Sequence, residues 1–115
     1  MIQTSSQSRV FVAIDPIDFR KRMDGTAGYC RVHLEREPLD GAIYVFRNKR
    51  ASMIRLYFFD GWSEWCCDVR IANGNLKNWP KSEDALTGLA AHNLQVLIRN
   101  GNVKGANIPE AWKTL

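Results

Sequence analysis

The sequence predicts an α+β domain in which an antiparallel β-meander of about four to five strands carries two helices on one face. Three observations lead to this fold class. Short β-branched and aromatic runs alternate in the manner of strands, two segments carry helically spaced apolar residues, and Gly, Pro and Asn mark the boundaries between them. At 115 residues with 45% hydrophobic residues, the chain is long enough to close one core.

The chain is expected to form one domain with a short segment at each end. We expect residues 1–8, which are rich in Ser and Gln, to be flexible, residues 9–101 to form the domain and residues 102–115 to form a C-terminal tail. Three cysteines make an odd, unevenly spaced set, and no run resembles a signal peptide or reaches membrane length. We therefore expect a reduced, cytoplasmic protein with no membrane partner, and the sequence leaves its oligomeric state open.

The first two predicted elements are a strand and a helix. The run "RVFVAI" is typical of a buried strand, and Asp15-Pro16 ends it. Asp18 is a plausible N-cap for the helix that follows. Gly25 and Gly28 weaken this helix and indicate that it bends or begins late. Its apolar stripe consists of Phe19, Met23, Ala27, Cys30 and Leu34.

The middle of the chain predicts a meander of strands. The runs "AIYVFR", "MIRLYFF", "WSEWCCDVRI" and "NLKNW" are strand-like, and Asp60-Gly61 and Asn73-Gly74 are hairpin-turn signals. In the second run, strand alternation places Ile54, Leu56 and Phe58 on one face and Arg55, Tyr57 and Phe59 on the other. We expect the face of Arg55 and Tyr57 to be uncovered, and Trp65 to be buried in the next strand.

A second helix is predicted after Trp79-Pro80. Ser82 or Asp84 can cap it, and it ends near Gly101. Its apolar stripe consists of Leu86, Leu89, Ala90, Leu94, Leu97 and Ile98. Packing both helices against the apolar face of the sheet would bury that face and leave the polar face free to bind a partner.

A cluster of basic residues is the most informative functional feature. The formal net charge is +4 with a pI near 9.2, and an equal local charge falls within the nine residues from position 47 to 55, which contain no acid. We expect this hairpin to contact DNA phosphates through Arg47, Lys49, Arg50 and Arg55. The alternative is that these cations only keep the hairpin soluble and block edge pairing.

A second basic cluster, Arg20-Lys21-Arg22, follows the first strand. Arg20 and Lys21 are further candidate DNA contacts, although consecutive helical residues point in different directions. Local pairing with Asp15, Asp18 and Asp24 is an equally good interpretation.

Two aromatic residues are candidate contacts with a protein partner. Tyr57 would lie beside Arg55 on the uncovered sheet face. Trp112 lies in "IPEAWKTL", a tail segment with little core of its own to join.

Catalytic chemistry is the weaker alternative. A Mg²⁺-dependent nuclease would need converging carboxylates, for which the candidates are Asp15 and Asp18 with Asp60, or Glu64 with Asp68. Turn, capping and cross-strand roles explain these acids equally well. His33 and His92 have no zinc-ligand spacing, and the sequence contains no phosphate loop or nucleophile elbow. We therefore expect a protein that is not an enzyme and that holds no metal or cofactor.

Two motif blocks carry a family resemblance. The blocks are "DFRKRMDG" and "VFRNKRASMIRLYFFDG", and they are followed by "NGNLKNWP" and a Leu-rich segment. Over roughly residues 10–101 the chain resembles the TnpB accessory proteins of the insertion sequence 66 family of bacterial transposable elements. The matching positions of the first block are Asp18, Phe19, Arg20, Lys21, Met23, Asp24 and Gly25. Those of the second block are Val45, Phe46, Arg47, Asn48, Lys49, Arg50, Arg55, Asp60 and Gly61.

This chain departs from the family pattern in three places. Arg22 stands where the family usually has glycine, Val69 replaces a usual basic residue, and the segment from Gly74 to Trp79-Pro80 is one residue longer. The resemblance implies an accessory role in transposition beside a separate, catalytic transposase. DNA and that transposase are therefore the expected partners. A protein that binds only other proteins is the remaining alternative.

Overall fold

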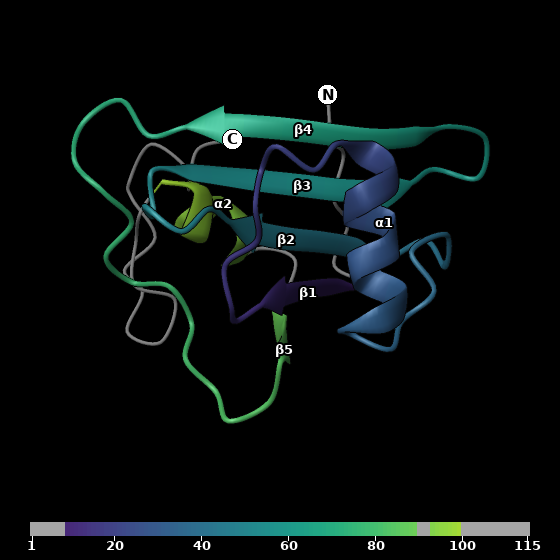
Figure 1. The fold of residues 1–115 in the computed structure, drawn as a ribbon. Coiled ribbons are helices and arrows are strands. Elements are labelled where there is room, and N and C mark those ends of the chain that lie inside the picture. The colour runs from purple at the N-terminus through teal and green to yellow at the C-terminus, as the bar shows by residue number, and fades with distance from the viewer. Residues whose placement is uncertain (1–8, 90–92, 100–115) are drawn as a thin grey trace.

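The computed structural model describes residues 9–89 and 93–99, and this part of the chain forms five strands and two helices (Figure 1). The strands form one sheet in the order β4-β3-β2-β1-β5. The elements in chain order are β1 (Val10–Ala13), α1 (Met23–Val32), β2 (Ile43–Arg47), β3 (Met53–Phe59), β4 (Glu64–Arg70), β5 (Leu86–Leu89) and α2 (Asn93–Ile98). The α+β class is confirmed.

The sheet is mixed, so the prediction of a purely antiparallel meander is wrong. β2, β3 and β4 do form an antiparallel meander. β1 pairs with β2 in parallel, and β5 pairs antiparallel with the other side of β1. Parallel neighbours need a long crossover, and the connection between β1 and β2 contains α1.

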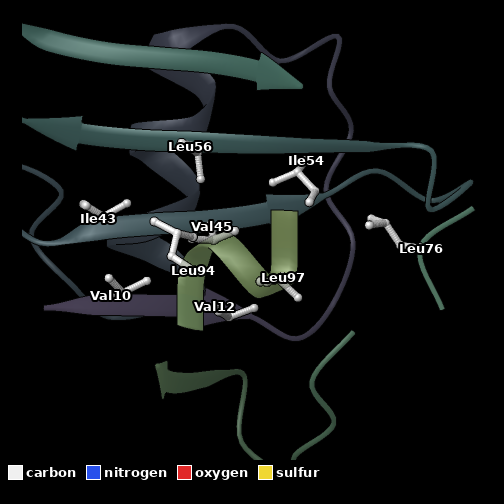
Figure 2. Close-up of a cluster of buried hydrophobic side chains, with 9 residues drawn as sticks. All are labelled: Val10, Val12, Ile43, Val45, Ile54, Leu56, Leu76, Leu94 and Leu97. Carbon is white, nitrogen blue, oxygen red and sulfur yellow. The ribbon is translucent and has the colours of Figure 1, made fainter. Parts of the chain in front are cut away.

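The two helices cover opposite faces of the sheet, which corrects the expectation that both lie on one face (Figures 1 and 2). On the face of α2, the buried cluster is Val10, Val12, Ile43, Val45, Ile54, Leu56, Leu76, Leu94 and Leu97 (Figure 2). On the face of α1, it is Ala13, Ile17, Ala27, Cys30, Leu34, Ala42, Tyr44, Phe46 and Tyr57. The physical reason lies in β2, where successive residues point to alternate faces and the first four are all buried. A strand that is apolar on both faces needs a cover on each side.

The helix boundaries also differ from the sequence prediction. α1 begins at Met23, and Asp18 lies in a turn before it. The segment expected to open the second helix is β5, and residues 75–79 form no strand. Leu86 and Leu89 fit a helical spacing, but in β5 they point to opposite faces, and each packs against a different cluster. The free edge of β1 offers this segment backbone partners that no local pattern reveals.

Other expectations concern exposure and the ends of the chain. Trp65 is 42% exposed instead of buried. The terminal segments 1–8 and 102–115, including Trp112, lie outside the described residues, and the domain boundaries stay a prediction. Among the described helices, none has the length and hydropathy needed to cross a membrane.

Candidate nucleic-acid interface

An open pocket of about 750 Å³ brings the two basic segments of the sequence together. One wall comes from residues 16–22, which precede α1, and the other comes from the loop between β2 and β3. We call this site the basic pocket and define it by its four cations, Arg20, Arg22, Lys49 and Arg50. The two clusters are about 25 residues apart in the sequence, and the fold joins them into one surface.

The loop between β2 and β3 is held by the side chain of Asn48. Its Oδ1 accepts hydrogen bonds from the backbone N–H groups of Ser52 and Met53 at 2.8 and 3.0 Å, and its Nδ2 donates to Ser52 Oγ at 2.9 Å. The N–H of Ala51 donates to the Asn48 carbonyl at 3.0 Å, which closes a tight turn. Lys49 and Arg50 lie exposed at the tip of this turn.

The far side of the same loop is fixed by the chain that follows β4. Leu76 N–H donates to the Ala51 carbonyl at 2.6 Å, and Ile71 N–H donates to the Ser52 carbonyl at 2.9 Å. Ala51 has a φ of 55°, in the left-handed region that costs a non-glycine residue about 1–2 kcal/mol. The surrounding hydrogen bonds hold it there. The two cations therefore project from a braced loop.

The second wall is attached to the end of β2. Ile17 N–H donates to the Arg47 carbonyl at 3.0 Å, which places residues 16–22 beside the loop. Asp18 and Arg20 form an ion pair with Nη2 and Oδ2 2.8 Å apart, and Asp18 Oδ1 also accepts from the backbone N–H of Arg20. Hydrogen bonds from Arg20 lower the pKa of the Asp18 carboxyl to about 2. Arg20 is therefore largely neutralised by its neighbour.

Arg55 is buried, so the expectation that it lies on an uncovered face is wrong. Its side chain is 2% exposed. Nε and Nη2 donate to the two oxygens of Asp68, Nη2 also donates to the Phe19 carbonyl, and Nη1 donates to the Lys21 carbonyl and Thr26 Oγ1. Since a guanidinium has five N–H donors, this arrangement uses its full capacity.

The role of Arg55 follows from these partners. Two of them are main-chain carbonyls of the segment that carries Arg20, Lys21 and Arg22, so Arg55 ties that segment to the sheet. Its guanidinium also lies 4.4 Å from the centre of the Phe19 ring. Burial opposes its charge, but the hydrogen bonds and charge of Asp68 outweigh this effect and raise the pKa of Arg55. Arg55 positions the basic pocket and does not line it.

Of the other predicted DNA contacts, some line the basic pocket and some lie outside it. Lys49 and Arg50 line the pocket, and Lys21 is exposed just outside it. Arg47 is half-buried, and by strand alternation it shares the α2 face with Val45. Its Nε is buried and has no hydrogen-bond partner among the described residues.

Tyr57 cannot contact a partner in this conformation, because its side chain is 0% exposed. Its hydroxyl donates to Glu64 Oε1, and burial together with this bond raises the pKa of the phenol. The uncovered sheet face expected from the sequence is the face that α1 covers. Trp112, the other aromatic candidate, lies outside the described residues.

Arg22 is the one cation of the basic pocket that was not among the predicted DNA contacts. It is exposed, it precedes Met23, the first residue of α1, and it lines the pocket opposite the loop. Its membership of the cluster at positions 20–22 was the available signal. Among the described residues, Arg22, Lys49 and Arg50 have no carboxylate partner.

The acidic residues proposed for metal-dependent cleavage are held apart by separate partners. Asp18 binds Arg20 and Asp68 binds Arg55. Asp60 accepts from the backbone N–H groups of Trp62 and Ser63 and from the Trp65 indole, which lowers its pKa. Within residues 9–89 and 93–99, no three His, Cys, Asp or Glu side chains lie close enough to hold a metal ion.

Comparisons with known proteins give a family and two relatives. A family model described as "IS66 Orf2 like protein" matches residues 8–107. The uncharacterized protein y4jC of Sinorhizobium fredii is 39% identical over 61 residues, which are 53% of this chain and 52% of y4jC. The uncharacterized protein y4hO of the same organism is 24% identical over 113 residues, which are 98% of this chain and 96% of y4hO. This chain thus aligns with about half of y4jC and nearly all of y4hO. No solved structure matches.

Proposed function

We propose, since this chain belongs to the family of IS66 Orf2 like proteins, that it assists the transposition of such an element by binding DNA through the basic pocket. The protein acts in the cytoplasm as a non-catalytic accessory of a separate transposase. One observation carries this proposal: two basic segments that are distant in sequence converge on one open pocket.

The charges of the pocket favour an anionic partner. Both acidic side chains that line it, Asp18 and Asp68, are bound by an arginine of this chain. Arg22, Lys49 and Arg50 therefore keep their charge available to a partner, and Lys21 adds another exposed cation beside them. Lysine and arginine side chains are the usual partners of DNA phosphates.

The geometry favours contacts with the DNA backbone over base recognition. Lys49 and Arg50 project from a braced loop tip, and Arg22 approaches from the opposite wall, so the three cations can bind separate phosphates. Phosphate contacts fix the position of a protein on the duplex and carry no sequence information. We therefore expect weak binding with little preference between an element end and an unrelated duplex.

Salt dependence measures the number of phosphates bound. Each neutralised phosphate contributes about −0.9 to the slope of log K against log salt concentration. With three unpaired cations in the pocket and Lys21 beside it, the slope should lie between about −2.7 and −3.6. A slope near zero would contradict the proposal.

The experiment is a titration of a fluorescent element-end duplex and a scrambled duplex at several salt concentrations. The variant with Lys49→Glu and Arg50→Glu should lose measurable binding to both duplexes. A matched control carries Arg31→Glu and Lys81→Glu, which make the same charge change at exposed positions outside the pocket. The control should keep most of the affinity, and equal losses in both variants would mean that only net charge matters.

A second titration in the presence of the transposase separates the two expected partners. If the basic pocket docks on an acidic patch of the transposase, the free protein will not bind DNA, and the reversed pocket will abolish complex formation. That result would replace DNA with the transposase as the partner of this surface. A Mg²⁺-dependent nick in the duplex would overturn the non-catalytic assignment.

A further inference from the structure

β4 is an edge strand of the described sheet. It pairs with β3 on one side, and no other described strand pairs with it. The pairing continues without a bulge over all seven residues, from Met53 opposite Arg70 to Phe59 opposite Glu64. Monomeric proteins usually protect such edges with charged side chains, proline, a bulge or a very short strand. β4 has no proline and no bulge and is seven residues long, whereas β5, at the other edge, has only four residues. The charged residues of β4, Glu64, Asp68 and Arg70, carry both signs, so they can also be complementary to a second copy of the strand.

The ladder identifies the backbone groups that β4 leaves open. Ile71 N–H donates to the Ser52 carbonyl, and Asp60 N–H donates to the Ser63 carbonyl. Odd-numbered residues along this strand therefore direct their N–H and C=O groups toward β3. Alternation then directs the N–H and C=O groups of the even-numbered residues toward the open edge. These residues are Glu64, Cys66, Asp68 and Arg70.

From this edge we infer that two copies of the chain form a dimer by antiparallel pairing of β4 with β4, about a twofold axis at Cys67. The two sheets then continue as one. A twofold axis perpendicular to the sheet keeps equivalent faces together, so even-numbered residues must pair with even-numbered residues. This condition allows only registers centred on a residue.

Charge and length select one of these registers. A centre at Cys66 places Glu64 opposite Asp68 of the second copy, and a centre at Asp68 places that carboxylate opposite itself. Both put like charges together, which destabilises strand pairing. A centre at Cys67 pairs all seven residues and places Glu64 opposite Arg70 twice. It also places Trp65 opposite Val69 twice.

The side chains of Glu64, Arg70 and Trp65 are already positioned for these contacts across the dimer interface. Glu64 is oriented by the hydroxyl of Tyr57, and Arg70 is exposed with no ion-pair partner among the described residues. Trp65 is 42% exposed although it stacks on Phe58 at 5.9 Å, and its indole N–H is held by Asp60 Oδ2 at 2.8 Å. Pairing would cover part of this fixed apolar surface with Val69 of the second copy.

The twofold axis has a geometric consequence. It places the α1 faces of both copies, and therefore both basic pockets, on the same side of the joined sheet. Self-association does not depend on DNA, so its test is independent of the proposed function.

The first test measures the mass of the full chain by analytical ultracentrifugation over a range of concentrations. A reversible dimer is expected. Glu64→Arg or Arg70→Glu alone would create two like-charged pairs and weaken the dimer about tenfold. The variant with both changes restores opposite charges and should recover the wild-type dissociation constant. A monomeric wild-type chain, or a dimer insensitive to these reversals, would overturn the inference.

The second test uses the cysteines of the strand. At a twofold axis, Cys67 would face Cys67 of the second copy in a non-hydrogen-bonded pair, with about 4.5 Å between Cα atoms. This separation lies within the range for a disulfide. In a Cys66→Ser chain, a mild oxidant that accepts two electrons and two protons should couple the two thiols rapidly. A Cys67→Ser chain retains Cys66, which would lie opposite Asp68, and should couple much more slowly. Equal rates would exclude this register.

Discussion

Arg55 binds Asp68 across the ladder of β3 and β4, with Nε 2.7 Å from Oδ1 and Nη2 3.0 Å from Oδ2. The remaining hydrogen bonds of Arg55 hold residues 19–21 and Thr26. One buried guanidinium thus connects β3 and β4 to the segment that forms a wall of the basic pocket. Arg55 was expected to bind DNA directly, but in the structure it holds in place the segment that carries Arg20 and Arg22.

Arg55→Ala should lower the free energy of unfolding by about 3–5 kcal/mol, because it leaves buried acceptors without their donors. Arg55→Lys should lose much of the same stability, since one ammonium group cannot reproduce the planar fork. Urea denaturation measures both changes. Arg50→Ala, at the exposed loop tip, should stay within about 0.5 kcal/mol of wild type. An Arg55→Lys protein as stable as wild type would show that the fork is not needed.

Asn48→Asp should separate the structure of the loop from its charge. The carboxylate keeps the oxygen that accepts from Ser52 and Met53, so stability should change little. It also adds a negative charge to the lining of the basic pocket, so DNA affinity should fall severalfold. Asn48→Ala instead removes the acceptor and should cost about 1–3 kcal/mol in urea denaturation. Gln95→Glu on α2 makes the same charge change on the opposite face and serves as the control.

The carboxyl of Asp18 should titrate with a pKa of about 2, well below its ordinary value of 3.8, because Arg20 donates hydrogen bonds to its charged form. A folded-state pKa below the unfolded one means that the stabilising effect is complete above about pH 4 and is lost as the pH falls through about 2. Carbon-detected NMR titration gives the midpoint directly. Arg20→Ala should return it toward the ordinary value, whereas Arg22→Ala should leave it in place. An unchanged midpoint in Arg20→Ala would contradict this ion pair.

Leu97→Val and Leu34→Val test the two apolar layers. Leu97 packs on the α2 face and Leu34 on the α1 face, in separate buried clusters. Each change removes about one methylene and should cost about 1 kcal/mol. Because the two residues share no cluster, the double variant should lose the sum within about 0.5 kcal/mol. Strong coupling in thermal or urea unfolding would indicate that the helices share one layer.

Local pattern was sufficient for much of the fold. Four of the observed strands lie within the predicted runs, at residues 10–13, 43–47, 53–59 and 64–70. They could be predicted because the alternation of a strand is visible in consecutive residues. The glycines at positions 25 and 28 left open whether the first helix bends or begins late, and the helix begins at Met23 with both glycines inside it. The turn at Asp60-Gly61 was also predicted correctly, with Gly61 at a φ of 97° and Asp60 accepting from the following N–H groups.

The errors share one cause, which is that partners distant in sequence decide the outcome. Residues 86–89 became a strand because the edge of β1 was available to pair with them. A strand–helix–strand order is the signal for a parallel crossover, and it was present in the sequence before β2. Trp65 alternates with core residues, yet β4 lies at the sheet edge, where no described strand pairs with its outer flank.

The sequence by itself determined the family, the α+β class and the two basic clusters, because each of these is carried by neighbouring residues and their spacing. Only the tertiary structure decided that Arg55 is buried, that Arg22 joins Lys49 and Arg50 in one pocket, and that β4 lies at an edge of the described sheet. Burial and charge pairing depend on which segments meet in space. A cation that the fold surrounds with hydrogen-bond acceptors stabilises the protein itself. A cation that the fold leaves exposed to water is available to bind a partner.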